Sequence, residues 1–207
     1  MISRLISYLL TPLGQFFALL GLYLLFAAAP SPITVAVATL FFLRWERFDR
    51  YPEPWWRMKA VILFGTLPIV AAVTLSPAVY PLGAFMLLLN MATTLRYPES
   101  LLEGLNGVLG ICLMCWAAVF GWSPLPGDGM FSFPLPWWWI GAYTLWNHVF
   151  AAVRFPAAAA HSVALLAAPL VVAAAFGPGS WLFARGVTLS LGVIIGMAVL
   201  YQPEKTS

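Results

Sequence analysis

The residues of this chain best suited to chemistry are polar and ionisable side chains within or beside its apolar segments. Glu99, Glu103 and Asn106 follow one another at spacings of four and three residues. On a helix such residues share one face. Ionisable groups within a membrane segment are costly, so they are candidates for function.

A second polar stripe is expected in the apolar segment that ends near residue 154. Tyr143, Asn147 and Arg154 fall on one helical face, and His148 lies about 100° to the side. At about 1.5 Å per residue, His148 is some 9 Å deeper along the helix than Arg154. If these faces converge with the first stripe, they line a polar cavity open to the cytosol.

Such a cavity suits the binding or transport of a small molecule or a lipid group. Arg154 would pair with an anionic group, Tyr143 and Asn147 would form hydrogen bonds, and His148 could couple binding to protonation. The predicted ligand-binding residues are Asn90, Asn106, Tyr143, Asn147, His148, Arg154 and His161. In the structural alternative, the amides join helices and the charged groups are solvated.

Composition decides the environment in which these residues act. Of 207 residues, 62% are hydrophobic and only 8% are charged, against roughly 25% charged in a soluble domain. Lipid must therefore solvate most of the surface. We expect one all-α domain over residues 1–207, a polytopic helix bundle of the bacterial cytoplasmic (inner) membrane. The net charge of +3 is too scattered for a nucleic-acid partner.

Apolar segments separated by proline, glycine and charged residues predict eight transmembrane helices. Their expected bounds are Leu5–Ala27, Ile33–Leu43, Ala60–Leu75, Leu82–Leu95, Leu101–Gly121, Trp138–Val153, Ala158–Phe176 and Ala184–Tyr201. The second is short and follows Pro30 and Pro32, so a re-entrant segment and seven spans is the alternative.

Charge and aromatic residues predict the topology. With eight spans and both termini in the cytoplasm, every Lys and Arg except Arg185 lies on the cytoplasmic side. At the opposite side, we expect Trp137, Trp138, Trp139 and Trp181 to anchor the bundle at the membrane interface.

The loop after the second predicted helix resembles that of a known family. Asp49-Arg50-Tyr51-Pro52-Glu53-Pro54 is similar to the signature of the PrsW family of membrane-embedded proteases. That family places an adjacent Glu-Glu pair at the start of a later helix, followed by intramembrane His. Here Glu99 and Glu103 are one turn apart instead.

The resemblance implies an intramembrane hydrolase as an alternative function. Its catalytic residues would be Glu99, Glu103 and His148. A carboxylate would activate water, and a neighbouring His or Asn would stabilise the oxyanion.

A third hypothesis is a structural subunit of a larger membrane complex. The aromatic segment Gly121–Trp139 would then dock a membrane-protein partner. Asp128 is the only charge of this segment, and it could pair with Arg185. The sequence leaves the cofactor unknown, and we expect no metal site because Cys112 and Cys115 lack further ligands nearby.

Overall fold

The computed structural model describes residues 7–8, 11–46, 54–75, 80–95, 100–120, 135–154 and 159–196. These residues form eight α-helices and one 3₁₀-helix, and no strand occurs among them, so the predicted all-α class is confirmed. The helices are α2 (Pro12–Ala28), α3 (Pro30–Leu43), α5 (Pro54–Leu75), α6 (Tyr80–Ala92), α7 (Leu101–Phe120), α8 (Trp137–Arg154), α9 (Ala159–Phe176), η3 (Pro178–Ser180) and α10 (Trp181–Ile195).

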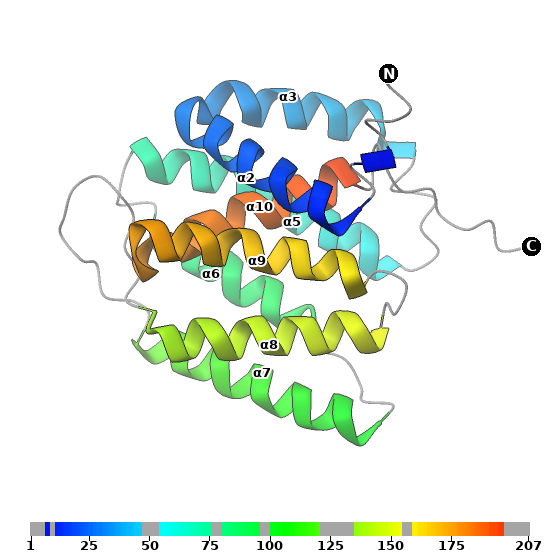
Figure 1. Ribbon diagram of the computed structural model, residues 1–207, viewed down its shortest axis with the longest axis vertical. Coiled ribbons are helices and arrows are strands. Elements are labelled where there is room, and N and C mark those ends of the chain that lie inside the picture. The colour runs from blue at the N-terminus through cyan, green and yellow to red at the C-terminus, as the bar shows by residue number, and fades with distance from the viewer. Residues whose placement is uncertain are drawn as a thin grey trace, which may run out of the picture.

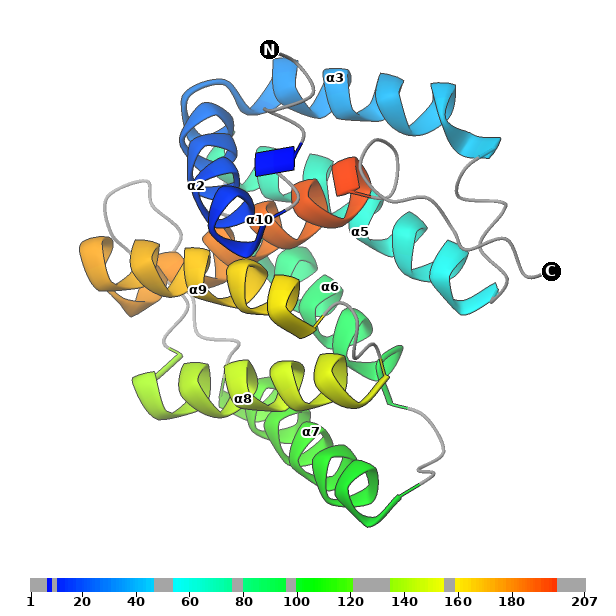
Figure 2. The ribbon, with the colours of Figure 1, turned by 45° about the vertical axis from the view of Figure 1, so that its right-hand side comes forward.

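Local sequence explains where the first two helices begin and end. Thr11 caps α2 by accepting a hydrogen bond from the backbone N–H of Gly14 at 3.0 Å, and Pro12 occupies the first position, where no donor is needed. Pro30 begins α3 in the same way, directly after Ala29. A single residue therefore separates the two helices, and the chain turns sharply between them (Figure 2).

The helices stack along the longest axis of the molecule, with α3 at one end and α7 at the other (Figure 1). Successive helices run in alternating directions, most clearly α2, α3, α7, α8 and α9. Helix α10 lies in the middle and packs against α5, α9, α2 and α3. Its residues from Trp181 to Ile194 are mostly buried, so α10 is the central helix of the bundle.

Within the described ranges, three helical segments, rather than eight, are long and apolar enough to cross a membrane: Leu101–Phe120, Ala159–Phe176 and Pro178–Ile195. Four shorter apolar segments accompany them: Pro12–Ala28, Pro30–Leu43, Met58–Ala72 and Leu82–Ala92. The 14 residues of α3 rise about 21 Å, less than the roughly 30 Å of a hydrocarbon core. The eight-span arrangement therefore stays a prediction.

Aromatic residues form the core between α7, α8, α9 and α10. Trp139 stacks on Tyr143 with ring centroids 5.3 Å apart, and Trp181 meets Tyr143 edge-on at 5.0 Å. Trp139 also donates a hydrogen bond to the carbonyl of Leu113 at 3.2 Å. Both tryptophans are fully buried, so the prediction that they anchor the membrane interface is wrong for these two. Trp137 and Trp138, by contrast, are exposed.

Helix α8 packs against α7 at Gly110 through the ring of Trp146. A Cβ atom there would lie 2.5 Å from Nε1 of Trp146, a rigid ring, whereas a Cβ at Gly107 would meet nothing within 4 Å. Gly110 therefore makes room for Trp146, and Gly107 does not perform this role.

We expect Gly110→Ala to lower the midpoint of thermal unfolding in detergent. Overpacking costs about 1 to 3 kcal/mol, which exceeds the gain of about 1 kcal/mol in helix propensity. Gly107→Ala is the matched control and should melt at or above the wild-type temperature. Equal unfolding midpoints for the two variants would contradict the close contact between Gly110 and the ring of Trp146.

Candidate functional site

The principal cavity has a volume of about 40 Å³ and lies where α5, α6, α8 and α10 meet. Leu63, Thr66 and Val70 of α5 line it at helical spacing. Helix α6 contributes Gly83, Met86, Leu87 and Asn90 to the lining, and α10 contributes a longer face from Leu182 to Ser190. The α5 residues lie in the middle of that helix, whereas the lining of α10 begins at its second residue, Leu182.

Four polar groups around this cavity are buried and have no hydrogen-bond partner in the part of the chain that the structure describes. They are Oδ1 of Asn90, the hydroxyl of Tyr143, Nε of Arg185 and Oγ of Ser190. Their residues are between 0 and 6% exposed. A buried polar group without a partner costs about 1 to 3 kcal/mol. A polar occupant that satisfies several of them at once would remove that cost.

Arg185 is the charged group of the cavity. Its side chain is 3% exposed. Nη1 donates to the carbonyl of Leu165 on α9 at 2.8 Å, and the guanidinium carbon lies 5.8 Å from the centre of the Tyr143 ring. The latter distance is within the range of a cation–π interaction. These two contacts hold the guanidinium in place and leave its Nε–H directed at no acceptor.

A second buried cation, Lys59, joins α5 to the end of α6. Its Nζ donates to the carbonyl of Asn90 and to Oγ1 of Thr94, both at 2.8 Å. The last carbonyls of a helix lack partners within the helix, and a cation there also complements the helix dipole. Lys59 therefore caps α6 and holds the backbone of Asn90 beside the cavity.

We expect Lys59→Met to destabilise the protein by about 1 to 3 kcal/mol, because buried acceptors of α6 lose their donor. The measurement is thermal unfolding in detergent, and the exposed neighbour Met58 supplies the control Met58→Ala. Equal melting temperatures for the two variants would show that the ammonium group is not a structural cap.

A smaller cavity of about 30 Å³ lies between the end of α6, α7 and α8. Thr94, Glu103 and Asn106 are its polar lining residues. Asn106 donates from Nδ2 to the carbonyl of Trp146 at 3.2 Å. Oγ of Ser100 accepts a hydrogen bond from the backbone N–H of Glu103 at 3.2 Å, so Ser100 caps the N-terminus of α7. Glu103 lies in the first turn of α7, where an acidic side chain interacts favourably with the helix dipole.

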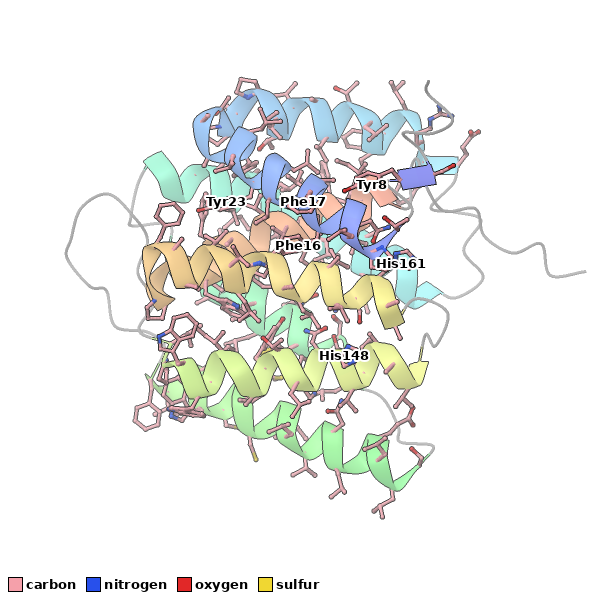
Figure 3. The ribbon with its side chains drawn as sticks, viewed as in Figure 1. Tyr8, Phe16, Phe17, Tyr23, His148 and His161 are labelled. Carbon is pink, nitrogen blue, oxygen red and sulfur yellow. The ribbon has the colours of Figure 1, made fainter. Side chains whose placement is uncertain are left out.

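His161 is on the first turn of α9, and His148 is on the neighbouring helix α8 (Figure 3). Nδ1 of His148 on α8 is 3.2 Å from Oγ of Ser162, whose hydroxyl donates to the carbonyl of Ala159. The hydroxyl oxygen therefore accepts from His148. Nδ1 of His161 is 3.0 Å from Oε1 of Gln15 on α2. Both rings are half-buried and link α9 to its neighbours.

The residues predicted to share one cytoplasmic cavity are distributed over several places. Asn90 and Tyr143 line the principal cavity, and Glu103 and Asn106 line the smaller one. His148, His161 and Asn147 are among the lining residues of neither. Asn147 is half-buried.

Several predicted features lie outside the described residues. These are Glu99, the side chain of Arg154, the segment Asp49-Arg50-Tyr51-Pro52-Glu53, and Asp128 with most of the aromatic segment Gly121–Trp139. Pro54 begins α5. Among the residues that are described, no group of three His, Cys, Asp or Glu side chains is placed to hold a metal ion.

Sequence reasoning missed Arg185, Ser190 and Lys59 as parts of buried polar sites. Lys59 was counted among the cytoplasmic charges, although it is 8% exposed. Arg185 was the one basic residue that did not fit the predicted topology, and that exception was the available signal. Ser190 carries no such signal, because serine is common at helix contacts.

Comparison with known proteins adds a family assignment. A family model described as "Family of unknown function (DUF5692)" matches residues 33–206. The matched segment includes every residue that lines the two cavities. No curated protein and no solved structure matches the chain.

Proposed function

For this chain, which belongs to the family of unknown function DUF5692, we propose that it is a membrane-embedded protein that binds or transports a small polar molecule in the cavity around Arg185. The observation that carries the proposal is the set of four buried, unpartnered polar groups around one cavity. Asn90 and Tyr143 belong to the binding residues expected from the sequence, and Arg185 takes the anion-pairing role expected of Arg154.

The position of the cavity supports transport as well as binding. Its α5 lining residues, Leu63, Thr66 and Val70, lie in the middle of that helix, and binding sites of membrane transporters lie near the middle of the bilayer. In the proposed topology, eight helices span the bacterial cytoplasmic membrane, both termini are cytoplasmic, and residues 1–207 form one domain. The alternating directions of the helices support this arrangement (Figure 1).

The outer surface supports residence in lipid. Large apolar side chains are exposed on several helices, and α7 alone exposes Leu101, Leu102, Leu105, Val108, Ile111, Val119 and Phe120. Exposed apolar surface of this extent is unusual in a soluble monomer. Lipid tails would solvate it at no cost.

Filling the cavity should remove binding without disturbing the fold. Gly83 lines the cavity, and a Cβ atom added there meets nothing within 4 Å. We expect Gly83→Val to fold and to lose stabilisation by the ligand. The measurement is the thermal midpoint in detergent with formate, chloride, ammonium, acetamide or glycerol, since a ligand that binds only the native state raises it.

Gly21→Val on α2 is the matched control, because a Cβ there also meets nothing within 4 Å and Gly21 is not a lining residue. We expect at least one solute class to stabilise the wild type and Gly21→Val alike, but not Gly83→Val. Identical responses of the two variants, or no response of the wild type to any solute, would reject the proposed site.

A second candidate function is a PrsW-like intramembrane hydrolase at the smaller cavity. The observation that favours it is that Glu103 and Asn106 line a common space of about 30 Å³, enough for a water molecule. His148 contacts Ser162 instead of this cavity, so the oxyanion donor would be Asn106.

Docking of a partner protein through Gly121–Trp139 is a third candidate.

If the hydrolase proposal holds, Glu103→Gln should reduce cleavage at least 100-fold with an unchanged thermal midpoint. The assay follows the release of soluble fragments from fluorescein-labelled casein by the protein in lipid vesicles. Asn106→Asp, which keeps the size of the side chain, tests the amide separately. Cleavage that persists in Glu103→Gln, or none by the wild type, would exclude Glu103 as the general base for this probe.

A further inference from the structure

We propose that the occupant of the Arg185 cavity is a small monovalent anion, with an oxyanion such as formate or nitrate fitting better than a halide. This inference rests on the proposed function and names its ligand class. It follows from the charge, the donors and the size of the cavity.

The charge around the cavity is positive. Arg185 is a fixed cation that is 3% exposed, and helices α5, α6, α8 and α10, which line the cavity, contain no Asp or Glu. The amine of Lys59 lies nearby, with its Nζ 2.8 Å from the carbonyl of the lining residue Asn90. In a medium of low dielectric constant, an uncompensated guanidinium strongly favours an anion beside it.

Three of the four unpartnered groups of the cavity can donate a hydrogen bond to an anion. Arg185 presents Nε–H, and the hydroxyls of Tyr143 and Ser190 can each turn a hydrogen toward a negative ligand. Oδ1 of Asn90 is an acceptor, so it can take a hydrogen bond from a hydroxyl or a water beside the anion but not bind the anion itself. The Nε edge of a guanidinium matches the two coplanar oxygens of a carboxylate or nitrate.

The size of the cavity favours a small ligand. Its volume is about 40 Å³, and one water needs roughly 10 to 15 Å³ by the same measure. The space therefore holds about three waters, or an anion of two to four heavy atoms. Sites for drug-sized ligands are roughly ten times larger.

The test measures thermal unfolding of the full-length protein in a neutral detergent, in potassium gluconate buffer at constant ionic strength. Formate, nitrate or chloride replaces gluconate stepwise, so only the identity of the anion changes. We expect the midpoint of the wild type and of Gly21→Val to rise by several degrees and to saturate. Arg185→Met should lose this rise.

Two milder variants keep the test decisive if Arg185→Met does not fold. Tyr143→Phe retains the ring that stacks on Trp139, and Ser190→Ala removes a single hydroxyl. Each should weaken the apparent affinity for the anion about tenfold, the loss expected for one hydrogen bond to a charged ligand. Unchanged affinity in both variants would overturn the assignment of the anion to this cavity.

Three other outcomes would also overturn it. An equal response to gluconate and to formate would indicate a general salt effect. Stabilisation by acetamide but by no anion, lost in Gly83→Val, would refute the anion and preserve the proposed binding function. No response to any solute would reject both proposals.

Discussion

The burial of Arg185 is the constraint on which the interior of this bundle depends. A guanidinium in the middle of an apolar helix costs several kcal/mol unless it finds partners. The structure supplies one carbonyl, from Leu165, and the face of Tyr143. Tyr143 is in turn held between Trp139 and Trp181. The aromatic core of α8 and α10 therefore also positions the cation and the cavity beside it.

The two buried cations serve different purposes, and their partners show why. Lys59 directs its ammonium group to the backbone and hydroxyl acceptors at the end of α6, which is a stabilising arrangement. Arg185 retains a donor that no acceptor satisfies. A group of this kind lowers stability unless something binds to it, and natural proteins tolerate such costs mainly at functional sites.

The polar residues within the helices divide into those that join helices and those that face a cavity. His148 and His161 fasten α9 to α8 and α2 through Ser162 and Gln15. Asn106 joins α7 to α8 through a backbone carbonyl. Interhelical hydrogen bonds of this kind are common between membrane helices. Asn90, Tyr143 and Ser190 instead line the same cavity as Arg185, with groups that have no partner among the described residues.

The sequence by itself determined the helical class and the location of each helix. Hydrophobic runs and proline positions are local signals, so α7 and α9 were predicted to within a residue at each end. The sequence also determined which polar residues lie within helices, including Asn90 and Tyr143.

Only the tertiary structure decided which of these residues meet, because a helical wheel gives a face but not the neighbour of that face. His148 contacts Ser162 of α9, whereas Glu103 and Asn106 line the smaller cavity. Arg185 is buried in the centre of the bundle because α10 packs among four other helices. Whether a polar side chain caps, joins helices or lines a cavity depends on atoms that lie far away in the sequence. No local pattern contains that information.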